Sequence, residues 1–212
     1  RDPRIGYFLK LDRWQWPNRT PQESSWFQYD LETTGYLPLI DMKMILVLNQ
    51  YLSTSKVVKP GNVERYTCTD QELTLNPKCQ EIADEIYKRY LENSTKGRAT
   101  ALGGFERLRG YPEGRFFDEH TNFRAIELRY YFDPVDLDFD VIFAQGILAE
   151  FQLAAFYEQG TVSSDLGNNF WNNFKDSYGL GLRFITGSAV GRIDVGFSDE
   201  GGATSIWWDY PF

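Results

Sequence analysis

The sequence has few of the residues from which catalytic and metal sites are most often built, with one histidine, two cysteines and two methionines among 212 residues. It has no apolar run close to the roughly 20 residues that a transmembrane helix needs, which excludes a helical membrane protein. Acidic residues outnumber basic ones, 30 to 22, and there is no basic stripe that could neutralise phosphates. Nucleic acid is therefore not expected as a partner.

The single histidine, His120, does not belong to a recognisable catalytic pattern. It lies beside Asp118 and Glu119 in a polar segment, and Ser198 has the wrong spacing for a nucleophile elbow. Four further acids are typical of a solvated turn rather than of a calcium site, namely Asp133, Asp136, Asp138 and Asp140. The sequence predicts no enzyme, no metal site and no cofactor.

The two cysteines, Cys68 and Cys79, lie close together in a polar segment. This arrangement favours a disulfide formed in an oxidising compartment. The alternative is two free thiols in a cytosolic loop.

Aromatic residues are abundant, at 17% of the chain, and they fall within segments that alternate between apolar and polar positions. Such alternation predicts strands with two different faces. We expect eight strands, at 5–16, 26–39, 42–53, 123–133, 141–162, 178–188, 191–198 and 203–212. The connections 54–122 and 163–177 are long, whereas those near 40, 136 and 190 are short. This pattern is typical of consecutive hairpins.

The strand predicted at 141–162 shows what the two faces carry. Leu153 and Tyr157 share one face with other apolar residues, whereas Gln152 and Glu158 lie on the opposite face. The six tryptophans all lie near predicted strand ends, as expected for aromatic girdles at the two interfaces of a membrane. We therefore predict an all-β, antiparallel transmembrane β-barrel formed by a single domain over residues 1–212. A soluble ligand-binding barrel also alternates and remains an alternative.

The long insertion, residues 54–122, divides into three parts. A polar part carries the cysteines, a helix is predicted from about Pro77 to Asn93, and a glycine-rich motif follows. Ile82, Ile86 and Tyr90 form one apolar stripe on that helix. We favour packing of the stripe against its own loop over binding of a partner.

The glycine-rich motif, LGGFERLRGY at 102–111, is followed by the alternating strand FRAIELRYYF at 123–132. This block resembles the arginine-glycine-aromatic motif in the inward-folded loop of the BamA-type outer-membrane assembly and translocation superfamily. The resemblance implies that Arg109, with Gly110 and Tyr111, enters the lumen, where Arg109 pairs with Glu127 and Glu158. Alternation alone also places both glutamates on the lumen face.

The C-terminal part extends the resemblance. Residues 178–198 resemble the second and third strands from the end of such barrels, and the ending WDYPF resembles their C-terminal recognition signal. The signal and one side of a lateral seam would consist of Ile206, Trp208, Tyr210 and Phe212. Eight strands alone leave little room for an inserted loop, so we expect half of a larger barrel of about sixteen strands.

The resemblance implies an integral protein of the outer membrane of a Gram-negative bacterium, or of an equivalent organelle membrane. It would insert outer-membrane proteins or translocate a polypeptide through a barrel with a lateral seam. Expected partners are the lipid bilayer, a polypeptide client, accessory lipoproteins or periplasmic proteins, and strands that close the barrel. Those strands would come from an N-terminal half, a second subunit or a second copy. The alternative function is a passive pore or structural barrel subunit without a client.

Overall fold

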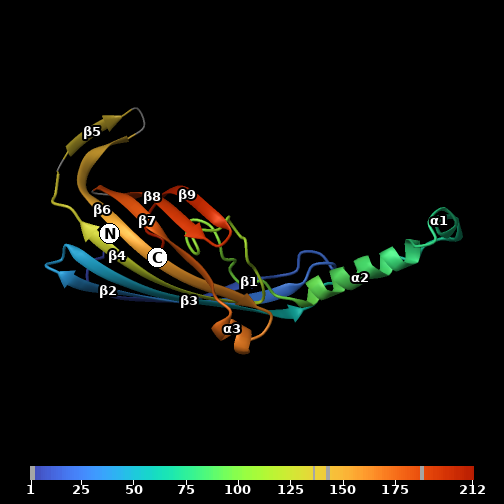
Figure 1. The fold of residues 1–212 in the computed structure, drawn as a ribbon. Helices are drawn as coiled ribbons and strands as arrows, with labels where there is room; N and C mark the ends of the chain where they lie inside the picture. The colour runs from blue at the N-terminus through green and yellow to red at the C-terminus, as the bar shows by residue number, and fades with distance from the viewer. Residues whose placement is uncertain (1–2, 136, 142–143, 187–188) are drawn as a thin grey trace.

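The computed structural model describes residues 3–135, 137–141, 144–186 and 189–212. Eight strands follow one another in a single antiparallel sheet, in chain order (Figure 1). They are β1 (Gly6–Trp16), β2 (Ser25–Ile40), β3 (Met44–Lys59), β4 (His120–Tyr131), β6 (Ala144–Ser163), β7 (Lys175–Thr186), β8 (Val190–Ser198) and β9 (Gly201–Trp208). The predicted all-β antiparallel class is confirmed.

A ninth strand, β5 (Leu137–Val141), pairs with the start of β6. The aspartates of this stretch are typical of a solvated turn, but the turn predicted from them is wrong here. Asp138 and Asp140 instead alternate with apolar residues at 137, 139 and 141, which is a strand pattern in its own right. Asp133 lies in the connection before β5, and Asp136 lies outside the described residues.

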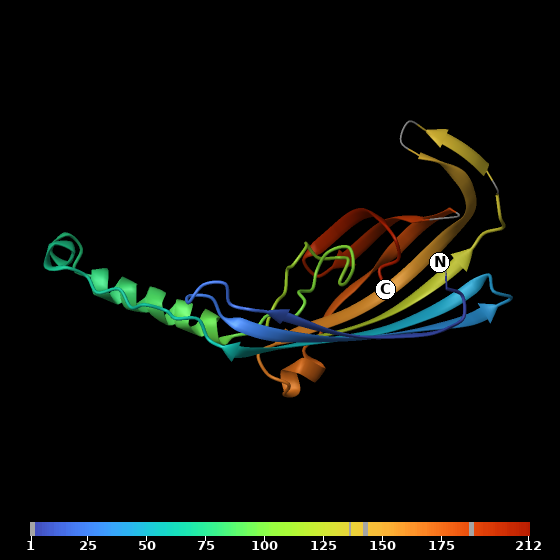
Figure 2. The same cartoon turned by 180° about the vertical axis from the view of Figure 1, so that it is seen from behind.

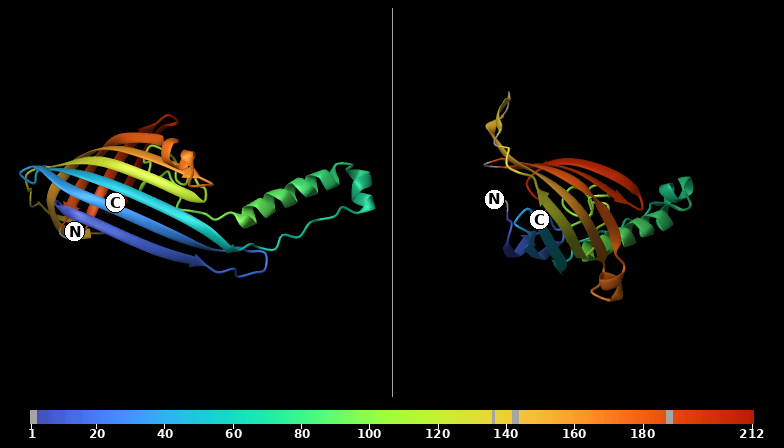
Figure 3. Two further views of the ribbon diagram at one scale, coloured as in Figure 1. Left: turned by 90° about the horizontal axis from the view of Figure 1, so that it is seen from below. Right: turned by 60° about the vertical axis from the view of Figure 1, so that its left-hand side comes forward.

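The sheet is strongly curved (Figures 2 and 3). In the described residues β1 and β9 stand at the two ends of the strand order and do not pair, so the sheet is open. Register shifts at Ser25/Trp26, at Pro38/Ile40 and at Leu148/Glu150 mark irregularities of the kind that bend strands. The curvature encloses the glycine-rich loop and the C-terminus on the concave side.

The two faces of the sheet are inverted relative to a water-soluble protein. On the convex face large apolar side chains are exposed, for example Leu48 at 40%, Ile126 at 50% and Leu180 at 57%. On the concave face charged and polar side chains are fully buried, including Glu127, Arg129, Gln152, Glu158 and Arg183, all at 0%. The alternation predicted for β6 is present, with Gln152 and Glu158 buried and Leu153 and Tyr157 exposed.

The insertion between β3 and β4 forms two distinct regions. A stalk, defined here as residues 60–96, projects beyond the sheet and contains α1 (Asp70–Leu75) and α2 (Cys79–Thr95) (Figure 1). The second region, residues 97–119, returns along the concave face. Within the described residues no helix is both long and apolar enough to cross a membrane.

The helix boundaries differ modestly from prediction. The helix expected from Pro77 is present as α2, but α1 and the short α3 (Asn168–Asn172) were not predicted. The start of α1 had a readable signal, because Thr69 and Glu72 form a capping box. The predicted disulfide between Cys68 and Cys79 is confirmed.

Candidate functional site

The glycine-rich motif forms a compact loop that presents Arg109 to the sheet. Leu102 and Phe116 exchange backbone hydrogen bonds of 2.8 and 3.0 Å at its base. Gly103 and Gly104 have φ values of +102° and +108°, which residues with a Cβ rarely adopt. Leu108 also has a positive φ, +57°, directly before Arg109. The loop backbone is therefore folded sharply, and this fold directs the arginine towards the strands.

Arg109 is buried and contacts three carboxylates on three different strands. Its Nε donates to Glu158 Oε1 at 2.7 Å, and its Nη2 donates to Glu127 Oε2 at 2.9 Å. Its Nη1 donates to Asp194 Oδ2 at 3.1 Å, and its backbone N–H donates to Glu158 Oε2 at 2.7 Å. The guanidinium carbon also lies 3.5 Å from the centre of the Phe156 ring. One side chain thus joins the loop to β4, β6 and β8.

Three more arginines from the sheet share these carboxylates. Arg129 Nε donates to Glu127 Oε1 at 2.7 Å, and Arg183 Nη2 lies 3.0 Å from Glu127 Oε2. Arg192 Nη1 donates to Asp194 Oδ2 at 2.7 Å. The seven side chains that form these ion pairs are each 0% exposed. We call this group of Arg109, Arg129, Arg183, Arg192, Glu127, Glu158 and Asp194 the arginine network.

The arginine network carries four positive and three negative formal charges, which gives a net charge of +1. Loss of one partner from a buried ion pair leaves an uncompensated charge and costs about 3–5 kcal/mol. Arg129 gains a further contact, because its guanidinium carbon lies 4.2 Å from the centre of the Tyr210 ring. The arrangement holds the loop against the sheet through ion pairs to three strands.

The residues after Arg109 fix the loop to the far end of the sheet. The Gly110 backbone N–H donates to Ser177 Oγ at 2.7 Å, and Ser198 Oγ donates to the Gly110 carbonyl at 3.0 Å. The Tyr111 hydroxyl donates to Asp199 Oδ1 at 2.5 Å. This hydrogen bond, followed by that from Lys175, lowers the pKa of the Asp199 carboxyl.

A close backbone approach makes this docking specific. A Cβ at Gly196 on β8 would lie 2.6 Å from the carbonyl carbon and oxygen of Arg109. These are backbone atoms that cannot move aside cheaply. Gly196 therefore sets how closely the loop lies against the sheet.

The C-terminal strand is shorter than the predicted 203–212. Ile206 and Trp208 are exposed on the convex face, at 72% and 69%. β9 ends at Trp208, however, and Asp209 has a φ of +90°. Tyr210 and Phe212 then turn to the concave side and pack against the buried clusters there. The alternation could not continue because Asp209 leaves the strand conformation and Pro211 lacks a ladder donor.

Arg109 contacts Glu127 and Glu158, the two glutamates that the sequence predicts as its partners, whereas the other four members of the arginine network were not predicted. A usable signal was present, because Arg192 and Asp194 lie two residues apart on β8 and Arg129 lies two residues after Glu127. Alternation places each pair on one face. His120, which showed no catalytic pattern, lies with its Nδ1 2.7 Å from Thr54 Oγ1 across the β3–β4 ladder.

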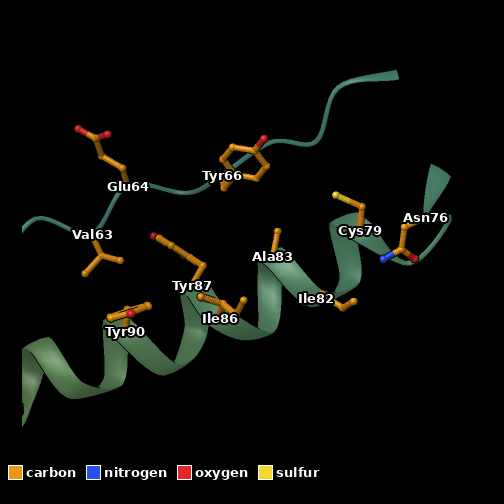
Figure 4. A pocket seen from close by; sticks show the side chains of 10 residues that line it. All are labelled: Val63, Glu64, Tyr66, Asn76, Cys79, Ile82, Ala83, Ile86, Tyr87 and Tyr90. Atoms are coloured by element: carbon orange, nitrogen blue, oxygen red, sulfur yellow. The ribbon is translucent and has the colours of Figure 1, made fainter. Parts of the chain in front are cut away.

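The stalk carries a separate surface. Beyond the Cys68–Cys79 disulfide, Arg65 Nε and Nη2 donate to the two Asp84 oxygens at 2.9 and 2.7 Å. A groove of about 370 Å³ lies between residues 63–66 and α2 (Figure 4). Ile82, Ile86 and Tyr90 remain about half exposed despite this packing, at 46%, 47% and 62%.

Comparisons of the chain with protein-family models, with curated proteins and with solved structures gave no match.

Proposed function

We propose that this chain is the membrane-embedded part of an outer-membrane β-barrel that inserts or translocates polypeptides. The observation that carries the proposal is the contrast between an apolar convex face and a concave face that holds a loop through the arginine network. Exposed apolar area costs about 25 cal/mol per Å² in water, and lipid removes that cost.

The two open edges of the sheet indicate that additional strands are needed to close a barrel. Unpaired backbone groups cannot face hydrocarbon without losing several kcal/mol each, so β1 and β9 require partners in a bilayer. The eight consecutive strands are each antiparallel to the next, so the edge strands β1 and β9 run in opposite directions. A complementary set of an even number of strands therefore closes the barrel with every pair antiparallel. Eight further strands would satisfy this condition, and we propose that they complete a barrel of about sixteen strands.

The proposed mechanism is physical. β9 is short, at eight residues, and begins with Gly201 and Gly202, which weaken a strand. A seam beside β9 that opens would expose backbone donors and acceptors to which a client strand adds. Ile206 and Trp208 would face lipid at this seam, and Tyr210 and Phe212 would hold its end from inside. Arg109 would keep the loop fixed while the seam opens.

The test compares client insertion with ion conductance in vesicles that contain the complete barrel. We expect Arg109→Ala and Glu158→Ala each to reduce insertion of an unfolded outer-membrane protein by about tenfold or more, whereas Arg115→Ala keeps wild-type insertion. Arg115 is a matched control because its ion pair with Glu200 is exposed. Altered conductance with unchanged client insertion would favour the passive pore. A chain that is monomeric and soluble without detergent would contradict the membrane assignment.

A further inference from the structure

A second groove, of about 620 Å³, lies where the β1–β2 loop meets the base of the stalk. Figure 2 shows this loop, in blue, beside the start of the stalk. The Asn62 backbone N–H donates to the Pro21 carbonyl at 2.8 Å, and a Cβ at Gly61 would lie 2.0 Å from the Gln22 carbonyl oxygen. The walls of the groove are therefore held together by backbone contacts.

The charge of this groove is opposite to that of the chain. Arg19, Lys96 and Arg98 line it together with a single carboxylate, Glu23, which gives a formal net charge of +2, whereas the chain carries −8. Glu23 is already engaged, since one of its carboxylate oxygens accepts from the Arg19 backbone N–H at 2.9 Å. Among the ion pairs of the described residues, none involves Arg19, Lys96 or Arg98.

The position of Arg98 is fixed by its neighbours. The Gly97 backbone N–H donates to Glu119 Oε1 at 3.2 Å, and the Ala99 backbone N–H donates to the Asp118 carbonyl at 2.9 Å. Arg98 itself is exposed between these two anchored residues. Lys96 caps the C-terminus of α2, where a cation is favourable without any ligand. That explanation does not apply to Arg19 and Arg98, which lie outside helices.

The remaining wall of the groove is aromatic. Trp16 and Trp26, at the ends of β1 and β2, stack with ring centres 4.1 Å apart and planes 4° from parallel, and Tyr90 of α2 also lines the groove. Tryptophans at strand ends mark the level of lipid headgroups in membrane barrels. An aromatic wall beside clustered cations fits a molecule that is anionic at one end and apolar at the other.

We propose that this groove binds the phosphate of an anionic membrane lipid. Arg19 and Arg98 hold the phosphate, Lys96 adds charge, and the Trp16–Trp26 pair contacts the apolar part of the lipid. The inference rests on the proposed membrane location. It adds a lipid-binding site near the β1 edge.

The experiment measures bound lipid by native mass spectrometry, on protein in zwitterionic detergent titrated with phosphatidylglycerol or with phosphatidylcholine. We expect the wild type to prefer phosphatidylglycerol. A cation near a membrane surface contributes about a fivefold factor, so Arg19→Gln with Arg98→Gln should weaken phosphatidylglycerol binding about 25-fold. Arg89→Gln is the matched control, because it removes the same charge from an exposed position on α2 outside the groove.

Three outcomes would overturn the proposal. In the first, the double variant retains the preference. In the second, Arg89→Gln weakens binding as much as the double variant does, which would indicate general charge attraction. In the third, inorganic phosphate displaces phosphatidylglycerol, and the headgroup without acyl chains binds as tightly as the intact lipid. That result would assign the groove to free phosphate. Insertion into vesicles, measured in parallel, separates the two proposals: protein that inserts without any lipid preference contradicts only the groove assignment, and protein that does not insert contradicts both.

Discussion

The two regions of the β3–β4 insertion are held in opposite ways. The loop around Arg109 is buried and is fixed by ion pairs to β4, β6 and β8. The stalk is exposed and is fixed by one disulfide and one exposed bidentate ion pair, both within the insertion. The loop therefore depends on the sheet, and the sheet's concave face depends on the loop. At its base the stalk also contacts the β1–β2 loop, where the Asn62 backbone N–H donates to the Pro21 carbonyl. Beyond that base its contacts lie within the insertion, so changes there should remain local.

The largest effect should come from Arg109→Ala. It leaves the buried Glu158 carboxylate without its cation and removes one cation each from Glu127 and Asp194, and it should lower the free energy of unfolding by about 3–5 kcal/mol. Arg65→Ala in the stalk should cost at most about 1 kcal/mol, since its ion pair is exposed. Urea unfolding in detergent measures both. Equal losses for the two variants would remove the proposed difference between the regions.

Glu127 and Glu158 should be unequal within the arginine network. Glu127 accepts from Arg109, Arg129 and Arg183, whereas Glu158 accepts only from Arg109 among the described residues. We expect Glu127→Gln to cost about 3–5 kcal/mol and Glu158→Gln about 2–3 kcal/mol. The double variant Arg109→Ala with Glu158→Gln should cost less than the sum, because the two side chains interact directly. Additive losses would indicate that they act independently.

Gly196→Ala tests the close approach of loop and sheet. The added methyl would overlap the Arg109 backbone, and we expect a loss of about 1–3 kcal/mol. Gly35→Ala on β2 is the control, because a Cβ there meets no atom within 4 Å. Thermal unfolding followed by electrophoretic mobility compares them. Similar midpoints for both variants would show that the loop lies further from β8.

Cys68→Ser with Cys79→Ser should act on the stalk alone. Loss of the disulfide should reduce the stability of the stalk by about 2–3 kcal/mol while the unfolding of the sheet stays unchanged. Limited proteolysis should then cut within residues 60–96 more readily. A lower unfolding midpoint of the sheet would show that the stalk supports it.

The smallest effect should be the pH dependence of the Tyr111–Asp199 contact. Hydrogen bonds from Tyr111 and Lys175 lower the pKa of Asp199 in the folded state. The stabilisation is therefore complete above the ordinary carboxyl pKa and is lost as the pH falls below about 4 and through the lowered value. Asp199→Asn removes this dependence. The difference in the free energy of unfolding between the wild type and Asp199→Asn should be constant near neutral pH and should shrink in acid. A difference that grows in acid would contradict the assignment.

More of the sheet than of the chain ends could be predicted from the sequence. Strand alternation predicted the faces that carry Glu127 and Glu158, because a period of two survives in any environment. Alternation gives the face of Asp194 by the same rule, but it does not identify Arg109 and Arg192 as its partners. The turn of Tyr210 and Phe212 into the concave side could not be read from alternation, since it depends on one positive φ at Asp209 and on packing against residues far away in the chain. The strand β5 was not predicted, because its acidic residues are typical of a solvated turn.

The central claim is that the convex face meets lipid and the concave face does not. Spin labels placed singly at Leu48, Leu153 and Leu180 on three strands, and at Lys88 on α2 as a water-exposed reference, test it directly in vesicles. The account predicts that oxygen, which concentrates in lipid, relaxes the three strand labels, whereas a water-soluble nickel complex relaxes only the label at Lys88. Strong relaxation of the three strand labels by the nickel complex would contradict it.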